Sequence, residues 1–193
     1  MAPSQSRRSI PASHQDADAL RTLAIELHEQ FLSLGLFTDF GDMCLSISLA
    51  LVLVFRHLGV AAVVKSCNLV IAHDWGAFLL GFEEPNRKTP PGLIDAHVVC
   101  VAEDRLLLDF GLGQARKTWH VPVSDSAVAL YTPNSAVMAT HHCNNSAYVW
   151  LDQPRHNPRV RAVMERNEAD ALAIFKRWRA ASKAPYKALR LQK

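Results

Sequence analysis

The sequence of 193 residues lacks a hydrophobic run long enough to cross a bilayer. Its longest apolar stretch, Leu45 to Phe55, is interrupted by Ser46 and Ser48 and falls well short of the ~20 residues that a membrane-spanning helix needs. Arg7 and Arg8 are not followed by the apolar segment that a secretory signal carries. We therefore expect a cytoplasmic protein with no membrane partner.

Paired cysteines and metal-binding motifs are also missing. There is no CxxC pair and no HExxH motif, and a chain with 49% hydrophobic residues can form an ordinary core without disulfides. We expect reduced thiols at the four cysteines, which are Cys44, Cys67, Cys100 and Cys143. The run His141-His142-Cys143 is more typical of a loop than of a metal site, because adjacent ligands rarely complete a tetrahedral shell. We expect no cofactor and no metal.

Charge is distributed unevenly along the chain. The net charge is +3, but from Arg155 onward eleven basic residues stand against three acidic ones, so the C-terminal part is strongly basic and the remainder is acidic. This segment carries no recognised nucleic-acid-binding motif. We expect a solvated tail over residues 184–193. Nucleic acid is not the expected partner, although the basic charge leaves that alternative open.

The pattern predicts a single domain over residues 16–183, preceded by a loose arm rich in Ser, Pro and Arg over residues 1–15. Leucines and Phe31 at helical spacing predict a helix that starts at Asp16 and ends before Gly35. A second helix is predicted from Met43 to His57, and it is apolar on nearly every side, which indicates burial in the middle of the fold.

Strands are expected after Gly59. The predicted strands are Val60 to Ile71, Trp75 to Phe82, Leu93 to Val101, Arg105 to Phe110, Trp119 to Val123, Ala127 to Tyr131 and Ala147 to Leu151. A final amphipathic helix is predicted from Arg161 to Ser182, with Leu172, Phe175 and Trp178 on one side. The fold class is therefore α+β, with the buried helix packed on an antiparallel sheet.

Cys44 stands at the predicted start of the buried helix. Free N–H groups and the positive end of the helix dipole at such a position favour a thiolate, which is the nucleophilic form of cysteine. A backbone N–H at the same helix end can also bind a developing oxyanion. A buried and inert cysteine is the alternative interpretation.

His97 and Asp109 lie on the two arms of the hairpin predicted around Glu103 and Asp104. They fall opposite or nearly opposite each other, so the carboxylate can accept a hydrogen bond from the imidazole and fix its tautomer. That arrangement is the base and the orienting acid of a nucleophilic triad. Asp95, two residues from His97 on the same strand face, is a second candidate for the acid.

The order of a Cys at a helix start, a strand with His and a strand with Asp resembles the transglutaminase-like and papain-like superfamily of thiol enzymes. Ala96-His97-Val98-Val99-Cys100-Val101 and Asp109-Phe110-Gly111-Leu112-Gly113 are also similar to the His and Asp segments of arylamine N-acetyltransferases. The resemblance implies that Cys44 is the nucleophile, His97 the general base and acid, and Asp109 the orienting residue. It also implies a minor polar role for Gln114.

These observations predict acyl transfer through a thioester, either as hydrolysis of an amide or peptide bond or as transfer to an amine. The substrate would be a peptide, a protein or a small amide. Two alternatives stay open: an acyltransferase like the arylamine N-acetyltransferases, and a non-catalytic binding protein on the same fold. Metal-dependent hydrolysis through His73, Asp95, His97 or His141 is a third, weaker hypothesis.

Overall fold

A computed structural model describes residues 14–40, 43–74, 76–81, 96–113, 123–154 and 157–182. The predicted strand at Trp119 to Val123 and the predicted tail at 184–193 lie almost wholly outside these ranges, as does most of the N-terminal arm. The described residues combine α-helices with an antiparallel sheet, which confirms the α+β class. None of the described helices is both long and apolar enough to span a membrane.

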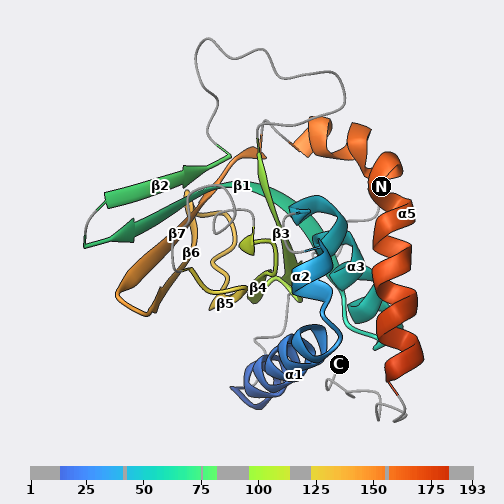
Figure 1. Ribbon diagram of the computed structural model, residues 1–193. Helices are drawn as coiled ribbons and strands as arrows, with labels where there is room; N and C mark the ends of the chain where they lie inside the picture. Colours follow the sequence, from blue (N-terminus) through green and yellow to red (C-terminus); the bar gives the residue numbers. More distant parts are fainter. Residues whose placement is uncertain are drawn as a thin grey trace, which may run out of the picture.

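The helices lie on one side of the molecule (Figure 1), and they are α1 (His14–Ser33), α2 (Leu36–Phe40), α3 (Cys44–His57) and α5 (Asn157–Ala181). α1 begins at His14, slightly inside the range expected for the arm, and it ends before Gly35 as predicted. α3 matches the second predicted helix, and α5 packs along it. Gly35 and Gly59 take φ values of +67° and +79°, the left-handed conformation that stops a helix.

Within the described residues, seven strands form one antiparallel sheet. Their bounds are β1 (Ala62–His73), β2 (Gly76–Leu80), β3 (His97–Ala102), β4 (Leu106–Asp109), β5 (Ala127–Leu130), β6 (Val137–Cys143) and β7 (Ser146–Asp152). The order is β5-β4-β3-β1-β7-β6, with β2 paired to β1, and the two end strands β5 and β6 pack against each other. The sheet is therefore almost closed into a barrel (Figure 1).

Among the described residues, the two larger of three apolar clusters fill the two sides of the sheet. One joins α1, α3 and α5 to the outer face of β3 and β4, and α3 stands at its centre with Ile47, Ala50, Leu51, Val54 and Phe55 all buried. The other lies inside the curled sheet and contains Leu69, Tyr148 and Trp150. The prediction that α3 is a core helix is confirmed, and the core fixes the position of its first residue, Cys44.

Two sequence expectations were wrong. His141 to Cys143 do not form a loop: they belong to β6, which pairs with β7 through a tight turn at Asn144 and Asn145, both with positive φ. In α5, Leu172 is exposed, whereas Ala171, Ile174 and Trp178 are buried. Trp178 is therefore on the buried side as predicted, Phe175 is partly buried, and Leu172 lies outside the stripe that packs against α3.

Candidate active site

The β3–β4 hairpin brings His97 and Asp109 together. The register pairs Cys100 with Leu108 and Val101 with Leu107, so His97 and Asp109 lie on the same face as a diagonal pair, two residues from direct opposition. His97 Nε2 and Asp109 Oδ2 are 2.6 Å apart. The side chains are 1% and 0% exposed, so this contact is made out of water. The predicted pairing is confirmed.

The Asp109 carboxyl group is held by two further donors. The indole Nε1 of Trp150, on β7, donates a hydrogen bond of 2.8 Å to Oδ2. The backbone N–H of Gly111 donates a hydrogen bond of 3.1 Å to Oδ1. Oδ1 is therefore held by Gly111, and Oδ2 is held by both His97 and Trp150. These bonds keep the carboxyl group from rotating away from the imidazole. Trp150 was not anticipated from the sequence.

The protonation of His97 is set by competing effects. Burial alone would lower the pKa of the imidazole, but the charge of Asp109 and the hydrogen bond to it act in the opposite direction, with a further contribution from the hydrogen bond and charge of Cys44. The net result raises the pKa of His97 from 6.5 to about 10. At neutral pH His97 is therefore an imidazolium ion that faces Cys44.

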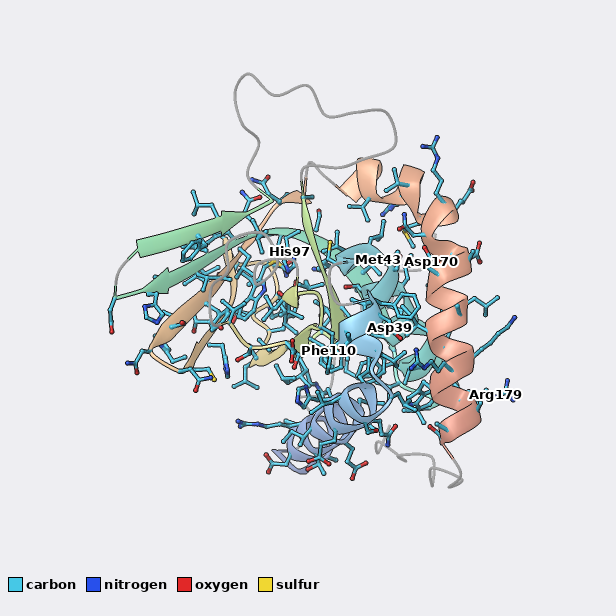
Figure 2. All side chains as sticks on the ribbon, viewed as in Figure 1. Asp39, Met43, His97, Phe110, Asp170 and Arg179 are labelled. Carbon is cyan, nitrogen blue, oxygen red and sulfur yellow. The ribbon has the colours of Figure 1, made fainter. Side chains whose placement is uncertain are left out.

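Cys44 approaches the imidazole from the other side of the site. Figure 2 labels His97, on β3, and Met43, the residue before Cys44, and the hydrogen bond and charge of Cys44 that act on His97 show that the sulfur is close to the imidazole. His97 Nε2 is bound to Asp109. The second ring nitrogen, Nδ1, makes no hydrogen bond of standard geometry within the described residues. Nδ1 is thus the atom left to exchange a proton with the Cys44 thiol.

Cys44 is the first residue of α3 and is partly exposed. Met43, the residue before it, makes no side-chain hydrogen bond to the helix end. The N–H groups of a first helical turn have no partner within the helix, so they stay available to an anion beside the sulfur. The predicted position of Cys44 at a helix start is confirmed.

Gly111 explains how the hairpin and the helix come so close. A Cβ atom at Gly111 would lie 2.7 Å from Cβ and 2.8 Å from Cα of Cys44, which no side chain can occupy. Gly81 plays a similar part behind His97, since a Cβ there would lie 2.5 Å from the His97 backbone nitrogen. Two glycines therefore permit the backbone contacts on which the site depends.

The other cysteines have different surroundings. Cys67 lies on β1 directly opposite His97 but is fully buried, and burial, then the charge of Asp109, raises the pKa of its thiol. Burial likewise raises the pKa of the Cys100 thiol. Cys143 is partly exposed but lies on β6, away from the imidazole. Within the described part of the chain, Cys44 alone joins exposure to contact with His97.

Asp95 and Gln114, the secondary candidates, lie outside the described residues. The carboxylate that contacts His97 in the described residues is that of Asp109, the first choice.

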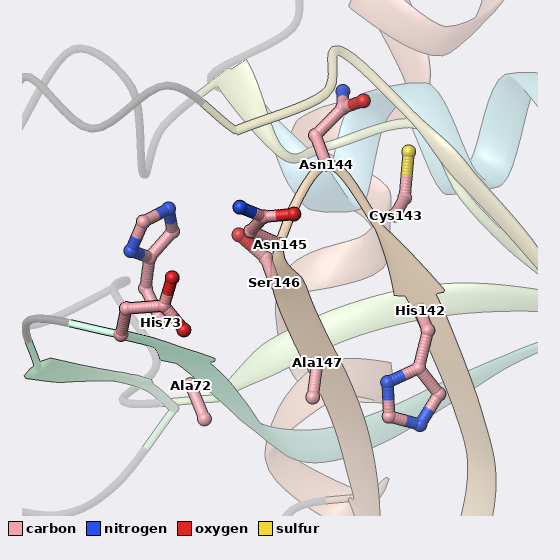
Figure 3. A pocket seen from close by; sticks show the side chains of 9 residues that line it. Ala72, His73, His142, Cys143, Asn144, Asn145, Ser146 and Ala147 are labelled. Atoms are coloured by element: carbon pink, nitrogen blue, oxygen red, sulfur yellow. The ribbon is translucent and has the colours of Figure 1, made fainter.

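The metal hypothesis gains no support in the ranges that the structure covers, where no group of three or more His, Cys, Asp or Glu side chains could hold an ion. Figure 3 shows the pocket at the end of β1 and the β6–β7 turn, where several of these residues gather. There the side chains of His142 and Cys143 point to opposite sides of β6 and do not converge.

Comparison with protein-family models, with curated proteins and with solved structures finds no match for this chain. The site must therefore be judged on its own geometry: a partly exposed thiol at a helix start, a buried imidazolium and a buried, fully anchored carboxylate.

Proposed function

We propose that this protein is a thiol enzyme that transfers acyl groups through a thioester on Cys44, with a fold of the transglutaminase-like and papain-like type. The observation that carries the proposal is the 2.6 Å contact of His97 Nε2 with Asp109, which leaves Nδ1 for Cys44. Two further features support a catalytic histidine over a purely structural one: a partly exposed cysteine at its second nitrogen, and three donors on its carboxylate partner.

The chemistry follows from the position of each group. The Cys44 sulfur, as thiolate beside the His97 imidazolium, attacks the acyl carbon of an amide, and a C–S bond forms as the carbonyl oxygen becomes an oxyanion. The N–H groups at the start of α3 stabilise that charge. The C–N bond then breaks, and the leaving amine takes the proton from Nδ1 of His97.

The second half of the reaction regenerates the thiol site. Water or an amine attacks the thioester carbon, neutral His97 accepts its proton, and the C–S bond breaks to return the thiolate and imidazolium. Asp109 stays in place throughout and keeps the imidazole in one orientation. Hydrolysis of a peptide, a protein or a small amide and transfer to an amine use the same first step.

The test needs no knowledge of the natural substrate. Iodoacetamide at neutral pH should alkylate Cys44 about ten times faster or more than Cys143, which is also partly exposed and serves as the internal reference. A chemical acyl donor such as p-nitrophenyl acetate should release a burst of nitrophenol and leave an acetyl group on Cys44. Cys44→Ala should abolish the burst, whereas Cys143→Ala should leave it unchanged.

Equal alkylation of Cys44 and Cys143 would contradict an activated thiol. A burst that survives in Cys44→Ala would assign the acylation to another residue. The first of these results would favour a non-catalytic binding protein.

A further inference from the structure

A groove of ≈ 430 Å³ lies where α3, the start of β1 and the start of α5 meet, and its floor includes the buried side chains of Val52 and Val160. Apolar side chains of both helices line it, among them Leu49, Val52, Val160 and Met164. Val63 of β1, which is 48% exposed, also lines it. The groove contains no residue of the triad, so it is a second feature of the molecule.

One wall of the groove is an open sheet edge. β1 pairs with β3 over Ala62 to Cys67, but on its other edge the pairing with β7 begins only at Cys67. No described strand therefore covers that second edge between Ala62 and Lys65. In an antiparallel strand, alternate residues direct their N–H and C=O groups to each edge, so backbone groups of this segment point into the groove.

The groove is positively charged. Arg56 and Arg161 line it and are exposed, and neither forms an ion pair with a described residue. The ammonium group of Lys65 is engaged by the hydroxyl of Tyr131, and no carboxylate lines the groove. An occupant with acidic side chains would complement this charge.

The terminal segments of the chain itself are poor candidates for that occupant. Residues 1–13 contain Arg7 and Arg8 and no acidic side chain, and residues 183–193 contain four basic residues and no acidic side chain. Both would be repelled by Arg56 and Arg161. The two terminal segments therefore do not supply the complementary charge.

We propose that this groove binds an acidic, extended peptide segment of a partner protein, which adds a strand to the open edge of β1. Main-chain hydrogen bonds to the segment Ala62–Lys65 supply affinity, and alternate side chains of the peptide meet the apolar helix faces and the two arginines. The edge is short, so the peptide needs only about five residues in extended form.

The probe is a fluorescent peptide of about eight residues with alternating Val and Glu, titrated into the full chain and followed by anisotropy. Wild-type protein should bind it more weakly as salt rises. The double variant Arg56→Glu with Arg161→Glu should weaken binding about tenfold or more, whereas Arg166→Glu, an exposed reversal on the same helix outside the groove, should leave it unchanged.

A second arm uses only the wild-type protein and so does not depend on how the variants fold. The same peptide with N-methyl groups along its backbone keeps its charges and side chains but cannot extend a sheet, and it should bind about tenfold more weakly or worse. Hydrogen exchange at Val63 to Lys65 should slow only with the unmethylated peptide.

Equal affinity for the N-methylated and unmethylated peptides would overturn the proposal, as would absence of peptide binding. Binding of anionic lipid vesicles that requires Arg56 and Arg161, without peptide binding, would assign the groove to a membrane surface instead. Alkylation of Cys44 should be the same in the groove variants, so this proposal and the triad can fail separately.

Discussion

Replacement of Asp109 by Asn removes one charge from the site. The side chains have the same shape, but the amide has a single oxygen, so it keeps the acceptor for either Trp150 or Gly111 and not for both. The wild-type imidazole has a pKa of about 10, so at neutral pH it is protonated in roughly a thousandfold excess. Without the carboxylate, the remaining dominant effect is burial, which lowers the pKa of His97 below 6.5.

In Asp109→Asn, His97 is therefore mostly neutral at pH 7, and Cys44 loses the cation beside it. An ordinary thiol is only a few per cent ionised at neutral pH, so the alkylation of Cys44 by iodoacetamide should slow by about tenfold or more. The rate is measured by mass spectrometry of the Cys44 peptide, with Cys143 as the reference in the same sample.

The matched control is Asp104→Asn. Asp104 lies in the turn of the same hairpin with φ of 50°, a conformation that Asn tolerates, and it is exposed. In this control variant, iodoacetamide should alkylate Cys44 at the wild-type rate. If Asp109→Asn also labels Cys44 at the wild-type rate, the imidazolium does not activate the thiol and the reasoning from the pKa of His97 is refuted.

Three further predictions concern stability and packing. Because the pKa of His97 in the folded protein lies above 6.5, protonated His97 stabilises the fold fully below pH 6.5, and this contribution is lost as pH rises towards 10. Urea unfolding should show the free energy of unfolding fall by up to roughly 5 kcal/mol over that range in the wild type and not in Asp109→Asn. An equal fall in both proteins would contradict this prediction. Gly111→Ala should displace Cys44, slow its alkylation and cost about 1–3 kcal/mol, whereas Gly76→Ala, where a Cβ meets nothing within 4 Å, should change neither quantity. Trp150→Phe should remove a hydrogen bond to a buried carboxylate and lower the free energy of unfolding by about 2 kcal/mol; unfolding at the wild-type urea concentration would show that the indole does not hold Asp109.

Local patterns in the sequence were enough to predict several parts of this structure. Helical spacing placed α1 and α3, and two apolar runs around a polar turn placed the β3–β4 hairpin. The proximity of His97 and Asp109 follows from that hairpin alone, because they are only 12 residues apart. Cys44 at a helix start is likewise a local inference.

Long-range partners were beyond this kind of reasoning. Trp150 is 41 residues from Asp109 and reaches it only because β7 pairs with β1 inside the curled sheet. The sheet order places β7 and β3 on either side of β1, and no local pattern encodes that choice. The strand β6 had a usable signal that was missed, since Asn144-Asn145 is a two-residue turn of the kind that joins hairpin strands.

His97 and Asp109 lie on one short hairpin, whereas Cys44 lies on a separate helix. Its contacts with that hairpin join residues that are far apart in the sequence. Local hairpins form quickly, and distant elements dock later. A nascent or partly unfolded chain can thus hold a complete His–Asp pair while its sulfur remains an ordinary thiol. This separation predicts that Cys44 gains its reactivity only once α3 has docked against the hairpin.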